Sequence, residues 1–266
     1  MAEEIRISVL MGIYNCAATL DEALESLYAQ TYQGFKVILC DDGSTDNTLE
    51  VAQRHAAAHP NVVLIRNERN MGLNFTLNHC LEHADTEYCA RMDGDDISLP
   101  TRFETEIKFL DEHPEYDIVT TPMKHFDETG IYRIGVGGKE PDIKDFPKST
   151  PFCHAPCMVR TKAYKAVGGY TVDKRLLREE DYHLWLKMYK QGFRGYTIKE
   201  PLYMMRDDRN AARRRTFKAR KNEAYVKHLA CKMFNLPFYY NIYCLKPLIL
   251  GIMPTWLYNF LYRLKK

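Results

Sequence analysis

Apolar strand-like runs and amphipathic helix-like segments alternate along residues 5 to 92, and this alternation constrains the fold more than any other feature. The runs at 5–11, 35–40, 62–65 and 88–92 have the length and composition of buried strands. Between them, residues 20–28, 48–59 and 73–83 repeat apolar side chains at helical spacing, and Thr19 with Glu22 has the pattern of a capping box. The order predicts an α/β fold, a mostly parallel sheet with helices on both faces.

An acidic run, Asp93-Gly94-Asp95-Asp96, follows the fourth strand-like run directly. Carboxylates this close raise one another's pKa unless a cation or hydrogen-bond donors lie among them, so a hard divalent ion such as Mg²⁺ or Mn²⁺ fits. A simple turn is the alternative, with Asp96 capping a helix that has Pro100 in its first turn. An EF-hand calcium loop is excluded, because Ile97 stands where that loop needs an oxygen ligand.

A second acidic loop, residues 41–46, follows the second strand-like run. In open α/β sheets the ligand crevice lies outside the carboxyl ends of the strands, so Asp42 and the 93–96 run should share one cleft. The chain has neither the Gly-x-Gly-x-x-Gly pattern of dinucleotide-binding proteins nor a phosphate loop ending in Gly-Lys-Ser or Gly-Lys-Thr. Phosphate would therefore be held by a metal and by side chains.

The eight cysteines are scattered, and no secretory signal precedes them, which predicts reduced thiols in a cytosolic protein. Cys153 and Cys157 form one close pair, with His154 between them. A structural zinc site needs four ligands, and no second close pair is present, so the sequence argues against zinc.

Five segments, in this order along the chain, resemble the family-2 inverting glycosyltransferases of the GT-A fold. They are Ser8 to Asn15, Asp41 to Asp46, Asn70-Met71-Gly72, Ala90 to Pro100, and Glu180-Asp181. The resemblance spans roughly residues 5 to 206. It implies a Rossmann-like GT-A domain over residues 1–208 and a nucleotide-sugar donor, with a UDP-sugar as the expected one.

The resemblance also implies roles for individual residues. The donor would be bound by Gly12, Tyr14, Asp42, Asn70, Arg91, Asp93, Gly94 and Glu180. Asp95 would hold Mn²⁺ or Mg²⁺ at the diphosphate, and His154 stands where relatives often place a histidine near that group. Asp181 matches the catalytic base. From the residues alone, Glu179 to Asp181 read as the charged first turn of a helix, which is the alternative for Asp181.

Two departures from the family pattern limit these roles. Many members carry an Arg-Asn pair where this chain has Leu77-Asn78, so the usual arginine to the base is missing, and Arg91 is the expected substitute. No Gln-x-x-Arg-Trp stretch follows Asp181, which predicts a single transfer for each binding event and argues against processive polymer synthesis.

Residues 209–266 differ from the rest of the chain in charge. They hold thirteen Lys or Arg and one acid, Glu223, whereas the chain as a whole has 37 Lys or Arg and 35 Asp or Glu. Trp256 begins an apolar helical face, and Lys246, Pro247 and Pro254 interrupt the apolar runs, so no ~20-residue span could cross a bilayer. We expect a basic, aromatic-rich helical extension on an anionic membrane surface. Coverage of the core, or a homodimer contact, is the alternative. No nucleic-acid-binding motif accompanies the arginines.

The sequence therefore predicts a metal-dependent, inverting glycosyltransferase at the cytoplasmic face of a membrane, acting on a glycan or lipid-linked acceptor. A sugar nucleotidylyltransferase is an alternative enzyme, but that class expects a glycine-rich basic loop where this chain has residues 12–15. A non-catalytic nucleotide-sugar-binding protein of the same fold is the alternative from another class.

Overall fold

The computed structural model describes residues 4–207 and 216–253. A central seven-stranded sheet has the order β10-β6-β9-β4-β1-β2-β3. Its strands are β1 (Ile7–Ile13), β2 (Phe35–Asp41), β3 (Val62–Arg66), β4 (Tyr88–Arg91), β6 (Ile118–Thr120), β9 (Met158–Arg160) and β10 (Gly195–Thr197). The predicted parallel sheet is confirmed for β3, β2, β1 and β4, and β9 runs antiparallel between β4 and β6, so the whole sheet is mixed.

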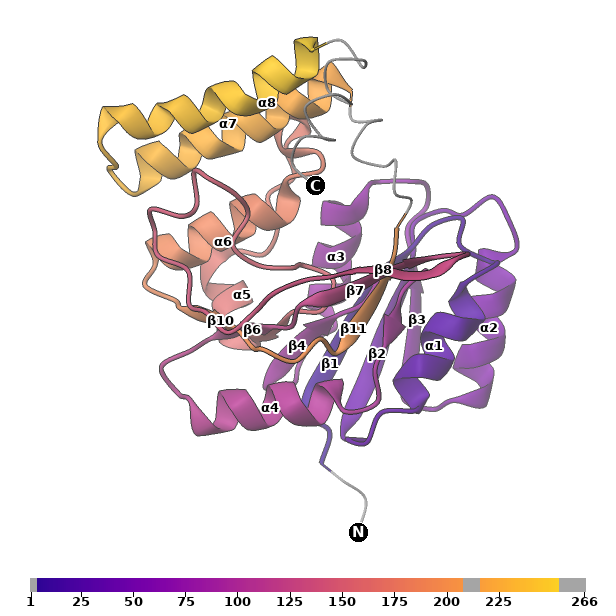
Figure 1. Ribbon diagram of the computed structural model, residues 1–266. Coiled ribbons are helices and arrows are strands. Elements are labelled where there is room, and N and C mark those ends of the chain that lie inside the picture. Colours follow the sequence, from indigo (N-terminus) through magenta and orange to yellow (C-terminus); the bar gives the residue numbers. More distant parts are fainter. Residues whose placement is uncertain (1–3, 208–215, 254–266) are drawn as a thin grey trace.

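Helices cover both faces of this sheet (Figure 1). They are α1 (Leu20–Tyr28), α2 (Thr48–Ala58), α3 (Leu73–Glu82), α4 (Arg102–Glu112), α5 (Thr161–Val167), α6 (Glu180–Lys190), α7 (Phe217–Met233) and α8 (Ile242–Ile252), with the short 3-10 helices η1 (Lys174–Leu176) and η3 (Phe238–Asn241). Successive side chains of a strand point to opposite faces. Accordingly, Val9 packs in the cluster with α1, α2 and α4, and Leu10 packs in the cluster with α3, α5 and α6.

A smaller sheet was not predicted from the sequence. It has the order β5-β11-β7-β8, formed by β5 (Ile97–Ser98), β11 (Tyr203–Arg206), β7 (Met123–Asp127) and β8 (Gly130–Ile134). β5 follows the acidic run directly and pairs antiparallel with β11, a strand about a hundred residues later in the chain. The small sheet therefore fixes the far end of the acidic loop.

The predicted capping box at α1 is wrong. Thr19 is the N-cap residue, but its side chain caps no backbone N–H of the helix. Its hydroxyl instead donates to the carbonyl of Gly94 at 2.9 Å. The first turn of α1 is thus tied to the acidic loop, a long-range contact that a local pattern could not reveal.

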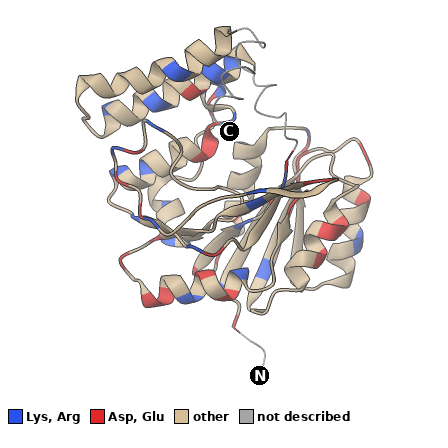
Figure 2. Cartoon of the chain, viewed as in Figure 1, with Lys and Arg blue, Asp and Glu red and all other residues tan. Residues whose placement is uncertain are grey.

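The basic extension packs partly on the body of the protein. Val226 and Ala230 of α7 are buried in the same apolar cluster as Leu184 and Trp185 of α6. α8 lies against α7 on its outer side, and Figures 1 and 2 show this helix pair above α6, with lysines and arginines along α7. For residues 217–233 the alternative of a core-covering segment therefore holds. The arginines at 209 and 213–215 and the Trp256 face lie outside the described residues.

Candidate active site

The acidic run forms a loop at the carboxyl end of β4. Asp93 is half-buried, Asp95 is exposed and Asp96 is buried. The Asp96 carboxylate accepts the backbone N–H of Arg206 at 2.8 Å, and the side chain of Arg206 donates to the carbonyl of Asp95 at 3.0 Å. The N-cap of α4 is Thr101, so Asp96 does not cap the next helix, as the alternative of a simple turn proposed.

The carboxylates of this loop oppose one another's ionisation. Desolvation, followed by the charge of Asp93, raises the pKa of Asp95. Burial, with the charges of Asp93 and Asp95, raises the pKa of Asp96 to about 8. Within residues 4–207 and 216–253, no three His, Cys, Asp or Glu side chains are grouped to hold a metal. Mg²⁺ and Mn²⁺ are often held by one or two carboxylates, with phosphate and water completing the shell, so Asp95 with Asp93 fits such an ion.

Gly94 lets the acidic loop approach the turn between β1 and α1. A Cβ atom at this position would lie 2.8 Å from the sulfur of Cys16. Gly12, the other glycine predicted to bind the donor, lies within β1, and its Cβ would lie 3.0 Å from the Thr76 methyl of α3. Both glycines allow close packing. Their role in binding the donor, which the sequence resemblance implies, stays a prediction.

The turn after β1 and the loop after β2 form one unit. The backbone N–H of Asn15 donates to the Ser44 hydroxyl at 3.1 Å, and the Asn15 side chain accepts the N–H of Thr45 at 2.9 Å. Asn15 itself has a φ of 49°, in the left-handed region that asparagine tolerates. Tyr14, beside it, keeps 45% of its surface exposed. The predicted base-side residue Tyr14 is therefore available to a ligand on a braced turn.

Asp42 holds the turn formed by Asn70-Met71-Gly72 in place. Its buried carboxylate accepts the N–H of Met71 at 2.8 Å and that of Gly72 at 2.9 Å, and Asn67 donates to it at 2.8 Å. Asn70, which precedes these donors, is exposed. The structure thus gives Asp42 a positioning role for the Asn70 turn. Asn67 was missed, because nothing in its local sequence pointed to Asp42.

Arg91 lies beneath the cleft and not at its surface. Its side chain is 1% exposed and donates to the carbonyl of Met92 and to the Asp93 carboxylate. Arg102 of α4 supports the same strand by donating to the Arg91 carbonyl at 2.9 Å. The Arg91 guanidinium orients the Asp93 carboxylate. The predicted contact of Arg91 to the nucleotide base stays a prediction.

His154 is a neutral residue in the same neighbourhood. Burial, and then the positive charge of Arg91, hold the pKa of His154 well below its usual range. Its Nε2 atom lies 2.8 Å from the Tyr170 hydroxyl. In the part of the chain that is described, it does not join Asp95 in a group of three metal-binding side chains. Its predicted role as a metal ligand is unsupported, and Tyr170, its partner, gave no signal in the sequence.

Asp181 lies in the first turn of α6, half-buried, with Glu180 beside it. Burial, together with the charge of Glu180, raises the pKa of Asp181 to about 6, although hydrogen bonds from backbone N–H groups and the charge of Arg91 act to lower it. Asp181 lines a cavity of about 290 Å³ between the segment 148–150, the start of α6 and helices α7 and α8. A carboxylate with this pKa is mostly ionised at neutral pH and can accept a proton.

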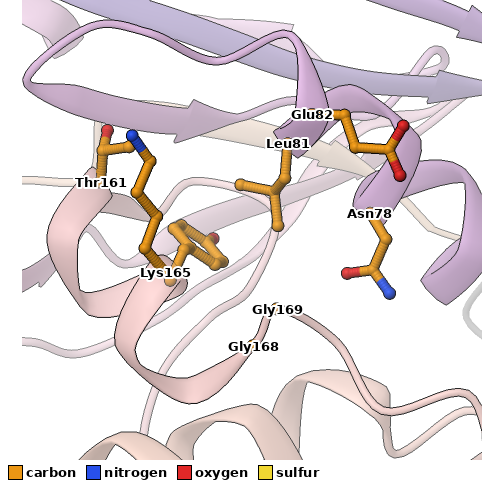
Figure 3. Close-up of a pocket in the computed structure, with 8 residues that line it drawn as sticks. Asn78, Leu81, Glu82, Thr161, Lys165, Gly168 and Gly169 are labelled. Atoms are coloured by element: carbon orange, nitrogen blue, oxygen red, sulfur yellow. The ribbon is translucent and has the colours of Figure 1, made fainter.

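Another pocket lies between α3 and α5 and holds none of the predicted site residues (Figure 3). Asn78 at its edge donates to the Tyr170 carbonyl at 2.8 Å and accepts the Tyr170 N–H at 2.7 Å. Gly169 is required there, because a Cβ would lie 2.4 Å from the Asn78 oxygen. Asn78, which stands in the family's Arg-Asn position, therefore anchors the segment that leads to α6.

All eight cysteines are free thiols, as predicted. Burial raises the pKa of Cys153 to about 11 and that of Cys157 to about 12. No zinc-binding group of side chains surrounds them among residues 4–207 and 216–253.

Comparison with known proteins identifies relatives along nearly the whole chain. Residues 8–168 match "Glycosyl transferase family 2". The chain is 43% identical over 255 residues to EpsE of Bacillus subtilis, a provisionally named glycosyltransferase, covering 96% of this chain and 92% of that protein. It is 30% identical over 216 residues to the UDP-Gal:alpha-D-GlcNAc-diphosphoundecaprenol beta-1,3-galactosyltransferase of Escherichia coli, covering 79% of this chain and 77% of that protein.

Solved structures share the fold. Staphylococcus aureus TarS, in complex with UDP-GlcNAc, superimposes with a TM-score of 0.71 at 19% identity, covering 93% of this chain and 71% of that chain. The mannosyltransferase PcManGT of Pyrobaculum calidifontis, in complex with GDP-Man and Mn²⁺, superimposes with a TM-score of 0.69 at 19% identity, covering 96% and 72%. The predicted GT-A architecture is confirmed.

Proposed function

The chain belongs to glycosyltransferase family 2, and from that premise we propose that it transfers a sugar from a UDP-sugar, with inversion and with the help of a divalent cation, to a hydroxyl of a glycan or lipid-linked acceptor. The family makes the protein a glycosyltransferase. It removes the nucleotidylyltransferase alternative, whose loop the sequence also lacks. The donor, the stereochemistry, the cation and the acceptor are the proposal.

The donor side is the cleft between the acidic loop and the Tyr14 turn. Asp95 and Asp93 would hold Mn²⁺ or Mg²⁺, which stabilises the negative charge that develops on the departing nucleoside diphosphate. Arg91 fixes the Asp93 carboxylate from below. Thr19 and Gly94 hold the loop against α1. These residues keep the carboxylates in position before a ligand arrives, so little reorganisation is needed when charge develops.

Asp181 is the proposed catalytic base. In an inverting transfer the acceptor hydroxyl attacks the sugar directly, so one carboxylate must take its proton within hydrogen-bond reach. Asp181 is the candidate because its pKa is raised toward neutrality by burial and because it opens into a cavity. The alternative, a structural acid in the first turn of a helix, accounts for neither property. The assignment of Glu180, beside it, to the donor stays a prediction.

The proposed acceptor side follows from a relative and from the composition of the cavity. The E. coli relative is named for transfer from UDP-Gal to a GlcNAc-diphosphoundecaprenol acceptor. In this chain the cavity beside Asp181 is lined by three lysines and an arginine together with three carboxylates, so cations are available there to an acceptor that carries anionic groups. These two observations support a lipid-linked acceptor.

An enzyme with a lipid-linked acceptor must act at a membrane surface, and α8 has an apolar face that could bind such a surface. Ile242, Leu245, Ile249 and Ile252 recur at helical spacing and keep 64, 51, 52 and 73% of their surfaces exposed. No described helix is both long enough and apolar enough to span a bilayer. An exposed apolar stripe beside a basic helix is typical of a helix lying in the plane of an anionic membrane. We place the enzyme peripherally at the cytoplasmic face. A homodimer through the same stripe is the alternative.

The observation that carries the proposal is that the acidic loop packs against the turn after β1 and is also bound to Arg91, a buried arginine whose charge acts on both His154 and Asp181. The test is transfer from α-linked UDP-hexoses, with Mn²⁺, to a short-chain GlcNAc-diphospholipid. We expect UDP release and a β-linked product, read from its anomeric proton coupling in NMR. An α-linked product would refute inversion. Donor binding without turnover on any acceptor would favour a non-catalytic binding protein.

A further inference from the structure

The cavity beside Asp181 is assembled from segments far apart in the sequence. Residues 148–150 form one wall, residues 178–182 at the start of α6 form another, and Glu223, Lys227 and Lys246 of α7 and α8 complete it. Its volume is about 290 Å³. Lys227 is 2% exposed, and its ammonium group donates to the carbonyls of Pro147 at 3.0 Å and Lys148 at 2.7 Å. This buried cation fixes the 148–150 segment against α7, so the wall is built into the fold.

Charged groups around the cavity are unevenly paired. Glu223 forms an ion pair with Arg220 at 3.2 Å, and Lys148 pairs with Asp145 at 2.8 Å. Arg178 and Lys246 also line the cavity, but neither has an ion pair or side-chain hydrogen bond with any other described residue. Two exposed cations thus face one cavity without a protein partner in the described part of the chain.

Arg178 has a further unusual property. Its φ is 70°, a left-handed backbone conformation that residues other than glycine, asparagine and aspartate rarely adopt. Such backbone conformations cost free energy, persist only where the surrounding structure enforces them, and cluster at ligand-binding sites. Here the conformation comes three residues before Asp181, on the segment that enters α6. It sets an arginine at the edge of the cavity, beside the proposed base.

We propose that this cavity binds a phosphate or diphosphate of the acceptor, with Arg178 and Lys246 as its principal cationic contacts and Asp181 at the hydroxyl of the same acceptor. The inference rests on the proposed function and adds the location and residues of the acceptor's anionic group. Arginine binds phosphate oxygens through two parallel N–H donors, and lysine adds a point charge. The hydroxyl of Ser149, on the wall formed by residues 148–150, can donate as well.

The charges separate this site from the donor's diphosphate. The donor cleft is lined by carboxylates, which need a cation to hold phosphate. The Asp181 cavity also has carboxylates, from Glu179, Asp181 and Glu223, but it adds four cationic side chains, Lys148, Arg178, Lys227 and Lys246. An enzyme that joins two phosphorylated substrates keeps them apart if each anion has a different kind of site. Asp181 lies in the cavity that has these cations, as a base that acts on the acceptor should.

The test compares acceptors with and without phosphate, using the full-length protein. Arg178→Gln and Lys246→Gln are assayed on a GlcNAc-diphospholipid and on an alkyl GlcNAc glycoside of equal chain length. Lys232→Gln, an exposed lysine of α7 away from the cavity, removes the same charge as a matched control. We expect each cavity variant to raise KM for the diphosphate acceptor about 10-fold or more, since a charge-assisted hydrogen bond is lost. KM for the glycoside and for the UDP-sugar should stay unchanged, as should all constants of Lys232→Gln.

Three results would overturn the inference. Equal KM values for the diphosphate acceptor in wild type and both cavity variants would show that the cations do not contact it. A rise in KM for the UDP-sugar instead would assign the cavity to the donor. If the cavity variants lost turnover with both acceptors and also stopped sedimenting with anionic vesicles, the two cations would be assigned to lipid headgroups. Failure of the wild type to use any acceptor would instead count against the proposed function.

Discussion

Replacing Asp181 with Asn should make the protein more stable and less active at the same time. Burial raises the pKa of Asp181 to about 6, from an ordinary value of 3.8. Above pH 6 the folded protein therefore holds a charge in surroundings that disfavour it, and Asn removes that charge while keeping the shape. A difference of about two pKa units corresponds to about 3 kcal/mol, and partial exposure reduces this to a gain of about 1–3 kcal/mol in the free energy of unfolding.

The size of this effect changes with pH in a defined way. An acid whose pKa is higher in the folded than in the unfolded state binds its proton more tightly when folded. Its ionisation therefore lowers stability as the pH rises from about 4, the unfolded value, to about 6, the folded value, and the loss is complete above that. The advantage of Asn should be largest near neutral pH and should shrink as the pH falls toward about 4. Urea unfolding followed by tryptophan fluorescence measures it, since Trp185 of α6 is buried near the site.

Activity should move in the opposite direction. Loss of a general base lowers the transfer rate by about 10²-fold or more, while affinity for the donor is kept. Asp173→Asn is a control that should change stability in the opposite direction. The Arg175 side chain and backbone N–H hold the pKa of Asp173 at about 2, so removing the Asp173 carboxylate should lower stability at neutral pH. An Asp181→Asn protein that is less stable than wild type near neutral pH, or that transfers at the wild-type rate, would refute this reasoning.

Three further predictions concern other parts of the molecule. Because the pKa of Asp181 is about 6, kcat/KM for the acceptor should fall about 10-fold for each pH unit below that value, and a flat profile would exclude Asp181 as the base. Asp42→Asn should lower the free energy of unfolding by about 2 kcal/mol and weaken donor binding, measured by urea unfolding and calorimetry, because the N–H groups of Met71 and Gly72 lose their anionic acceptor. Leu245→Ser or Ile249→Ser should weaken sedimentation with anionic vesicles about 10-fold, whereas Ile131→Ser, equally exposed on β8, should not; equal effects would remove α8 from membrane binding.

The sequence was most informative where contacts are local. The strands and helices between residues 5 and 92 were predicted nearly to the residue, because each has its own periodicity and each turn follows directly from the strand before it. The acidic loop could be placed at the carboxyl end of β4 for the same reason. The smaller sheet was missed because β5 and β11 are short and pair across about a hundred residues.

Side-chain roles were harder to predict than positions. Arg91 stands beside the acidic run in the sequence, but its burial depends on Arg102 and on β9, which no local pattern places there. Asp42 was predicted at the site, and the structure adds that its carboxylate holds the next turn. Arg178 gave no signal, because a left-handed backbone at an arginine is set by the surrounding fold.

The division of the chain at residue 208 stays a prediction, and the structure bears on only part of it. The sequence does become strongly basic after residue 208, but a count of charges cannot distinguish a helix that packs on the core from one that lies on a membrane surface. α7 shows both properties, with Val226 and Ala230 buried against α6 and with Lys218 and Lys221 exposed.

Thermal unfolding of the protein with a panel of nucleotide sugars, with Mn²⁺ or with EDTA, tests the central claim most directly. A ligand that binds only the folded state at about 100 times its Kd stabilises it by about 2.7 kcal/mol. We predict that a UDP-sugar raises the melting temperature with Mn²⁺ and not with EDTA, and that Asp95→Ala abolishes the shift, because the acidic loop needs a cation to hold a diphosphate. Equal stabilisation in EDTA, or an unchanged shift in Asp95→Ala, would contradict a cation-dependent donor site at this loop.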